Sequence, residues 1–290
     1  MSKSAILSSS IAKKYWMALT GLFLCLFLVG HLIGNLQLIF KVGEEGRKAF
    51  NEYAYFMQHN ILIKVMSYVT YISILFHAVD GFLLTIQNKK ARPVPYAYNN
   101  QGANTSTPAR MMAVLGSIIL IFIATHMVNF WAKMHFGGLK LHTYELTMDQ
   151  SVQPGAEKQF IYHTHTPSPQ AVPVVEQVEV KNELELYFKG SNLKIGEGYK
   201  DLHSAVIAFF TGNDTNGVKG NSMAVIAVAL YTLSMLVLGF HLWHGFSSTF
   251  QSLGINHKRY TPGIKIFGKI FSVIVPLAFA IIPIILFLNK

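Results

Sequence analysis

Five long apolar runs constrain the fold of this chain more than any other feature of its sequence. They cover about residues 16–40, 61–86, 111–132, 223–250 and 264–288, and each is long enough to cross a bilayer, which takes about 20 helical residues. Lipid offers no hydrogen-bond partners to a backbone, so each run should be an α-helix. With 51% hydrophobic and 13% charged residues, residues 1–290 are predicted to form one all-α integral membrane bundle of five transmembrane helices.

The distribution of Lys and Arg predicts how the bundle is oriented. These residues gather before the first run, between the second and third, and between the fourth and fifth, as Lys3, Lys13, Lys14, Lys89, Lys90, Arg92, Arg110, Lys258, Arg259, Lys265 and Lys269. The positive-inside rule then places the N-terminus in the cytoplasm and the C-terminus outside. The formal net charge of +10 is explained in this way by the membrane, without a nucleic-acid partner.

The same orientation leaves two connections on the outer side. Residues 41–60 have the composition of a short interfacial helix, and residues 133–221 should form an extramembrane loop or cap, with a turn or amphipathic helix over 199–210. The single cysteine, Cys25, excludes an intrachain disulfide, a four-thiolate iron-sulfur cluster and covalent haem attachment. A phosphate-binding glycine loop and a Rossmann fingerprint are both missing from the sequence.

Four of the apolar runs carry a deep histidine, at His31, His77, His126 and His241, the last followed by His244. An unpartnered imidazole in hydrocarbon is costly, so such residues face the bundle interior and usually mark a functional site. For one histidine, a hydrogen bond between helices would explain it equally well. One on each of four helices favours cofactor ligation.

Depth sorts the four histidines into two pairs. At 1.5 Å per residue, His31 and His126 each lie about 22 Å beyond the inner end of their run, in an outer layer. His77 and His241 each lie about 14 Å from the inner end, in an inner layer. Two pairs at two depths fit two six-coordinate haems, each iron taking one neutral imidazole from each of two helices.

Glycines near these histidines fit the same interpretation. Gly81 and Gly245 each follow a histidine by four residues, and Gly30 and Gly34 bracket His31, so a flat macrocycle could approach the backbone there. Small-residue packing between membrane helices explains these glycines equally well.

Two rival explanations of the histidines are weaker. Zinc would need three or four converging ligands, whereas here the pairs are split by depth. A proton relay usually includes acidic residues within the spans, and these spans have almost none.

Several segments resemble one known family, the membrane cytochrome b subunit of succinate:quinone oxidoreductases, in its single-subunit form with five helices and two haems b. The resemblance covers about two-thirds of the chain, through FLVGHLIGN at 27–35, FHAVDGF at 76–82, IATHMVN at 123–129 and FHLWHGFSSTFQSLGIN at 240–256. It implies a subunit of the bacterial cytoplasmic membrane that transfers electrons between quinone, usually menaquinone, and an iron-sulfur subunit. A flavoprotein subunit on the cytoplasmic side would interconvert succinate and fumarate. The physiological direction and a dimeric state of the complex stay open.

The resemblance also implies roles for particular residues. His77 and His241 would ligate the haem nearer the partner subunits, and His31 and His126 the distal haem, as depth also predicts. An acidic residue near the outer surface would belong to the quinone site; Glu52 is the candidate, ahead of Glu44 and Glu45, with solvated loop charges an equal alternative for all three. His244 stands three residues, about 300° of helix, from His241. It should therefore form a hydrogen bond, to a haem propionate or to a partner subunit, rather than ligate iron.

Two features depart from the family. Some members carry a glutamate, linked to a transmembrane proton route, where this chain has Gly239. The 133–221 segment is also longer than the family leads us to expect, and its histidines, His142, His163, His165 and His203, should be solvent-exposed rather than metal ligands.

Two alternatives remain. One is the cytochrome b subunit of another quinone-linked enzyme, such as a hydrogenase, formate dehydrogenase or nitrate reductase. The other is a histidine-dependent transporter without haem.

Overall fold

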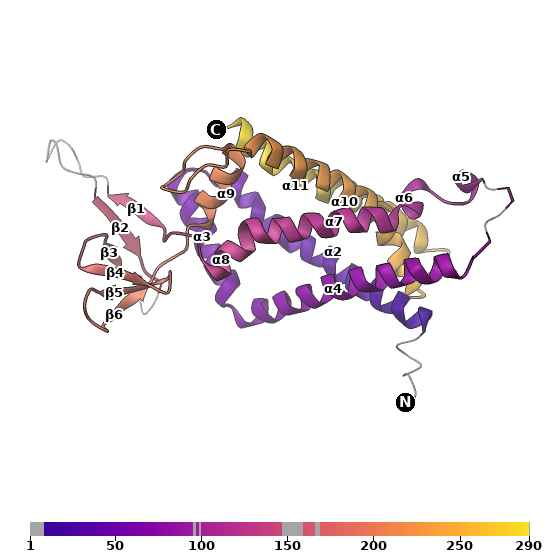
Figure 1. The fold of residues 1–290 in the computed structure, drawn as a ribbon, viewed down its shortest axis with the longest axis horizontal. Coiled ribbons are helices and arrows are strands. Elements are labelled where there is room, and N and C mark those ends of the chain that lie inside the picture. The colour runs from indigo at the N-terminus through magenta and orange to yellow at the C-terminus, as the bar shows by residue number, and fades with distance from the viewer. Residues whose placement is uncertain (1–8, 95–96, 99, 147–158, 166–168, 290) are drawn as a thin grey trace, which may run out of the picture. The chain divides into compact units, whose positions relative to one another are not determined.

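Five helices of the computed structural model are long and apolar enough to cross a membrane, counting within the described residues 9–94, 97–98, 100–146, 159–165 and 169–289. They are α2 (Ser10–Phe40), α4 (Ile61–Lys90), a continuous helical segment from Met112 to Phe136, α10 (Ala224–Ser252) and α11 (Thr261–Leu288) (Figure 1). Each predicted run corresponds to one of them, so the all-α, five-span fold class is confirmed. The chain is a multi-pass membrane protein by helix length and composition.

Large apolar side chains remain exposed along these helices, as at Leu26, Leu62, Ile121, Leu236 and Ile274, each more than 55% exposed. In water such surfaces would drive association. In a bilayer they are solvated by lipid tails, and the helices satisfy their own backbone hydrogen bonds.

The third span is the irregular one. It consists of α7 (Met112–His126), a π-helical turn η1 (Met127–Trp131) and α8 (Ala132–Phe136). A π turn inserts one extra residue and shifts the helix face that follows it. This shift begins immediately after His126. Two short helices, α5 (Gln101–Asn104) and α6 (Thr107–Arg110), precede the span.

The chain divides into two compact units. The first comprises Met1–Asn35, Ile61–Thr125 and Ile226–Ile285, and holds most of the spans. The second comprises Leu36–Asn60, His126–Val225 and Leu286–Lys290. Each is described by itself below.

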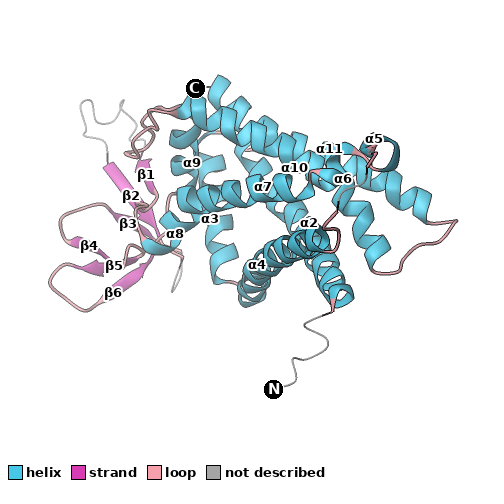
Figure 2. Ribbon diagram, turned by 45° about the vertical axis from the view of Figure 1, so that its right-hand side comes forward, coloured by secondary structure: helices cyan, strands magenta, loops and turns pink. Residues whose placement is uncertain are grey.

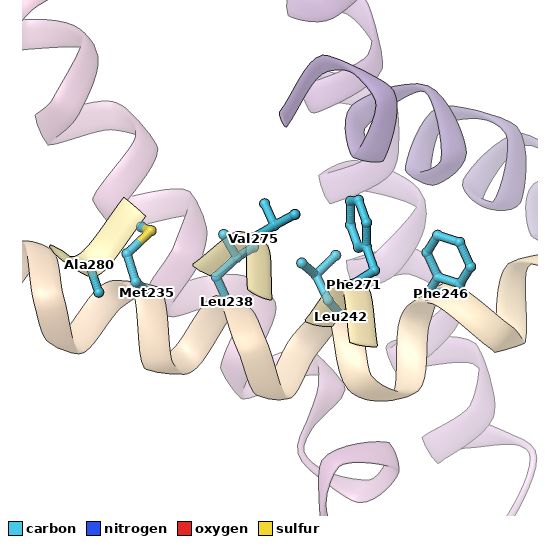
Figure 3. Packing of buried hydrophobic residues seen from close by; sticks show 7 residues of the cluster. All are labelled: Met235, Leu238, Leu242, Phe246, Phe271, Val275 and Ala280. Atoms are coloured by element: carbon cyan, nitrogen blue, oxygen red, sulfur yellow. The ribbon is translucent and has the colours of Figure 1, made fainter. Parts of the chain in front are cut away.

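The core of the first unit is the seam between α10 and α11. Met235, Leu238, Leu242 and Phe246 recur every three or four residues on one face of α10, and they pack against Phe271, Val275 and Ala280 of α11 (Figure 3). This spacing brings the side chains to one stripe of a helix. The seam is therefore a contact between the apolar faces of two helices.

Gly239 brings α10 close to the backbone of α11. A Cβ at Gly239 would lie 3.1 Å from the carbonyl oxygen of Ser272. Pro276, four residues further along α11, has no N–H to donate to that carbonyl. The helix thus loses a hydrogen bond at the point where glycine lets the neighbouring helix come close, and position 239 has no room for a glutamate.

Residues 137–223, called the connecting segment below, join the third and fourth spans within the second unit. They contain two three-stranded antiparallel sheets (Figure 2). The first has the order β1 (Thr143–Leu146), β2 (Gln159–His163), β3 (Ala171–Pro173), and the second β4 (Val178–Lys181), β5 (Glu185–Phe188), β6 (Lys194–Glu197). Leu141, Val172 and Leu186 form their small core, with Leu186 fully buried.

These strands are absent from the sequence-based prediction, which expects an extramembrane loop or cap here and assigns it no strand. The signal is present in VEVKNELELYF (178–188), where apolar residues alternate with polar ones, the period of a half-buried strand. Two helices of the unit are confirmed: α3 (Gly43–His59) within the predicted 41–60 helix, and α9 (Leu202–Thr211) close to the predicted 199–210.

We predict that Gly239→Leu destabilises the first unit by about 1–3 kcal/mol, because the larger side chain must push the α11 backbone away. The matched control is Gly263→Leu, since a Cβ at Gly263 meets no atom within 4 Å. Thermal unfolding of the detergent-solubilised protein, followed by circular dichroism, measures both. Equal melting temperatures for the two variants would contradict the packing described.

Candidate functional site

Two of the deep histidines come together inside the first unit. The rings of His77 on α4 and His241 on α10 have centroids 6.1 Å apart, at an interplanar angle of 68°. Two imidazoles that each bind one metal at about 2 Å would have ring centroids about 6 Å apart. The observed separation fits such a site, and it also lies in the range of about 4.5–7 Å that is usual for an edge-on pair of rings.

The hydrogen bonds of His77 determine which of its nitrogens is free. Nδ1 lies 3.2 Å from the carbonyl oxygen of Met17 and 3.4 Å from Oγ1 of Thr20. The carbonyl can only accept, and the Thr20 hydroxyl donates to Trp16 at 2.8 Å, so Nδ1 carries the proton. Nε2 is left with a lone pair, the state in which histidine ligates a metal.

His241 is in the opposite situation. Its Nδ1 is buried and has no hydrogen-bond partner among the described residues. An orphaned polar atom inside a protein costs about 1–3 kcal/mol, so this nitrogen, unlike Nδ1 of His77, lacks a hydrogen bond that would orient its ring.

Glycines of the neighbouring helices border both rings. A Cβ at Gly21 of α2 would lie 3.1 Å from Cε1 of His77, and one at Gly116 of α7 would lie 3.6 Å from Cε1 of His241. Sequence reasoning missed both glycines, because it examined only glycines within four residues of a deep histidine. Any larger side chain at position 21 would press on the His77 ring.

A repeated spacing of Met, Gly and His in the sequence points to Gly21 and Gly116. Met17, Gly21 and His31 on α2 have the same spacing as Met112, Gly116 and His126 on α7. The methionines occupy equivalent places: a Cβ at Gly81 would lie 4.0 Å from Cε of Met17, and one at Gly245 would lie 3.7 Å from Cε of Met112. α4, which carries His77, thus meets α2 in the same way as α10, which carries His241, meets α7.

The remaining predicted haem residues stay predictions. His31 lies in the first unit, with Phe27 stacked at 5.4 Å and Phe279 at 5.6 Å between ring centroids. His126 belongs to the second unit and meets Phe130 edge-on at 5.4 Å between ring centroids. Of the other candidates, Gly34 is buried, His244 is half-buried, and a Cβ at Gly30 would meet no atom within 4 Å.

The three candidate acids lie on α3 in the second unit. Glu52 is 42% exposed in its side chain, with its carboxylate 3.9 Å from Nζ of Lys48. Glu44 binds Arg47 at 3.1 Å and His142 at 2.7 Å. Glu45 is exposed. Glu52 borders a pocket of about 500 Å³ lined by Glu52, Tyr55, Phe56, His59, Asn60, His165 and Tyr199.

A buried ion pair fastens the connecting segment to α3. Nη2 of Arg47 donates to Oδ2 of Asp201 at 2.6 Å, and the two residues are 5% and 1% exposed. Asn51 donates to the other carboxylate oxygen at 2.9 Å. Burial alone would raise the pKa of Asp201, but Arg47 holds that pKa below its usual value. Asp201 also caps α9, accepting from the backbone N–H of Ser204 at 3.1 Å.

His142 belongs to the same network. The expectation that it is solvent-exposed is wrong: it is 2% exposed. The Asn51 amide donates to its Nδ1 at 3.1 Å, so Nε2 carries the proton and donates to Glu44 at 2.7 Å. The physical reason is that α3 supplies both polar partners an imidazole needs in order to be buried. His165 is exposed as expected, whereas His163 and His203 are half-buried.

These features define a helical multi-pass membrane protein with a pair of imidazoles inside its bundle and a β-rich segment between its third and fourth spans. Comparison of the chain with models of protein families, with curated protein sequences and with solved structures found no match in any of the three.

We predict that Arg47→Met destabilises the second unit by about 3–5 kcal/mol, because it leaves the Asp201 carboxylate buried without its counter-charge. Hydrogen–deuterium exchange of the α9 amides measures this loss. Adding Asp201→Asn should restore most of the protection, since the amide can still cap α9. The neighbouring exposed Lys48→Met should change it by less than about 1 kcal/mol, and an equal effect there would disprove the role of burial.

A pH dependence follows from His203, whose pKa burial lowers to about 4. An unfolded histidine titrates near 6.5, so protons bind the unfolded form first as the pH falls. Stability from this residue is therefore complete above pH about 6.5 and declines between 6.5 and 4. Protection factors of the α9 amides should fall across that window in the wild type and less steeply in His203→Gln. Parallel profiles would exclude His203 as the cause.

Proposed function

We propose that this protein is a di-haem b membrane anchor that transfers electrons between a quinone and an iron-sulfur subunit, with menaquinone as the first candidate for the quinone. That partner and a flavoprotein subunit would together form a succinate dehydrogenase or fumarate reductase. In this proposal the N-terminus faces the bacterial cytoplasm, the partners dock on that side, and the connecting segment lies outside the membrane. Succinate and fumarate would react on the flavoprotein, not on this chain.

The observation that carries the proposal is the pair His77 and His241. Their rings come from two different spans, and the ring centroids are 6.1 Å apart. Structural histidines between helices are usually hydrogen-bonded to each other or to a neighbour. Here Nδ1 of His77 lies beside the Met17 carbonyl and Nδ1 of His241 has no partner in the described part of the chain, so neither Nδ1 joins the two imidazoles, and Nε2 of His77 stays available to a ligand.

The surrounding residues fit a flat macrocycle held between two imidazoles. The Met17 carbonyl accepts from Nδ1 of His77 at 3.2 Å, which fixes the ring and makes Nε2 a stronger ligand. Gly21 and Gly116 keep bulk away from the rings. When bound, haem b supplies one-electron transfer at its iron. The apolar spans around it exclude water.

The second haem and the quinone site rest on weaker support. His31 and His126 share one spacing from the Met and Gly of their helices, which supports equivalent roles for them at the distal haem. For the quinone, Glu52 is supported by the pocket of about 500 Å³ that it borders, a volume in the range of small-molecule sites.

We predict that His77→Ala or His241→Ala removes one haem, and that His31→Ala or His126→Ala removes the other, so each variant keeps about half of the haem. Pyridine haemochrome analysis of the purified protein gives the haem-to-protein ratio. His257→Ala, at an exposed histidine outside the spans, is the control and should keep the full ratio.

Full haem content in all four variants would refute the ligand assignment. A wild-type protein without a haem band in its reduced-minus-oxidised spectrum would refute the proposed function as a whole and favour a transporter.

A further inference from the structure

The pocket beside Glu52 is built from two parts of the chain that are distant in sequence. Tyr55, Phe56 and His59 come from α3, whereas His165 and Tyr199 come from the connecting segment. The Tyr55 ring is stacked on His59 at 3.8 Å and tilted to His165 at 4.5 Å between centroids. Two imidazoles thus flank one phenol ring in an aromatic pocket wide enough for a small flat molecule.

The hydrogen bond of His59 to its own helix determines which of its nitrogens can accept. Its Nδ1 lies 2.9 Å from the backbone carbonyl oxygen of Tyr55. A carbonyl oxygen has no proton to give, so Nδ1 must donate, and Nε2 of the neutral ring carries a lone pair. His59 can therefore accept a hydrogen bond from a ligand hydroxyl.

His165 has the opposite polarity. Its Nδ1 lies 3.3 Å from the hydroxyl of Tyr199. Burial, together with the nearby Glu52, raises the pKa of Tyr199, so the phenol keeps its proton and, as the stronger acid of the two neutral groups, donates it to Nδ1. Nε2 of His165 is then the N–H nitrogen, a donor.

The wall that carries His165 and Tyr199 is held rigidly against α3. The backbone N–H of His165 donates to the carbonyl of Glu197 at 2.7 Å, and the carbonyl of Tyr199 accepts from the N–H of His142 at 2.7 Å. Tyr55 donates to Oε2 of Glu197 at 2.9 Å. Two residues beyond Tyr199, the ion pair of Asp201 with Arg47 anchors the chain to α3.

We infer that the connecting segment supplies one wall of a hydroquinone-binding pocket, in which His59 accepts a hydrogen bond from a ligand hydroxyl and His165 donates one to a ligand oxygen. This inference rests on the proposed function and extends it, because it gives the connecting segment a role in binding the quinol. The aromatic rings of Tyr55, Phe56 and Tyr199 would contact the faces and edges of the ligand ring.

The test uses the purified full-length protein in detergent and the reduced form of 2,3-dimethyl-1,4-naphthoquinone as the probe, with binding measured anaerobically by equilibrium dialysis. His165→Asn and Tyr199→Phe should each weaken binding, by about tenfold and by about threefold, as expected for losing or misorienting one hydrogen bond. His135→Asn, the same change at an exposed histidine outside the pocket, should bind as the wild type does.

A second probe isolates His59. The dimethyl ether of the same hydroquinone cannot donate a hydrogen bond, so it should bind the wild type about tenfold more weakly than the hydroquinone does. In His59→Phe this difference between the two probes should disappear, whatever the absolute affinity.

Haem content and circular dichroism, recorded on every sample, separate the possible failures. A wild type without haem refutes the proposed function. A haem-containing wild type that does not bind the hydroquinone, or that binds it as tightly after Tyr199→Phe and His165→Asn, refutes the pocket alone. Should His165→Asn lose its fold, Tyr199→Phe decides, because it retains the ring and removes only the hydroxyl.

Discussion

The cost of leaving a polar group without a partner in hydrocarbon governs this structure. It forces the five apolar runs to be helices, because only a helix satisfies its own backbone within the bilayer. It also makes each imidazole in a span conspicuous. Nδ1 of His77 has a hydrogen-bond partner in the Met17 carbonyl, whereas Nδ1 of His241 has none among the described residues. The proposed haem site rests on the closeness of these two imidazoles, whose ring centroids are 6.1 Å apart.

The second unit meets the same cost by a different route. There the polar groups are buried together: Arg47, Asn51, His142 and Asp201 bind one another with short distances and almost no exposure. Such a network is destabilising if one member is removed and specific when complete. Its effect is to join α3 to the connecting segment, and the pocket walls on the two sides are consequently fixed with respect to each other.

Much of the fold could be read from the sequence, because lipid turns hydropathy into a direct signal of helices. The pairing of His77 with His241 followed from counting residues along those helices. The repeated spacing that contains Gly21 and Gly116 was readable in the sequence, but their contacts with the two rings were not, since these depend on which helices are neighbours. Burial of His142 depends on α3 partners 91 and 98 residues away along the chain, which no local pattern reveals. The alternation of apolar and polar residues that marks strands in the connecting segment was present in the sequence, but the loop-like composition around it obscured that alternation.

The methionine-glycine-histidine frame shared by α2 and α7 has a consequence for symmetry. The frame helix α2 meets α4, which carries His77, and the frame helix α7 meets α10, which carries His241. The contacts of Met17 with Gly81 match those of Met112 with Gly245. A planar group held between His77 and His241 would therefore meet equivalent walls on its two faces. Rotating this group by half a turn would leave the contacts on its two faces alike, so only asymmetric substituents at its edge would distinguish the two orientations.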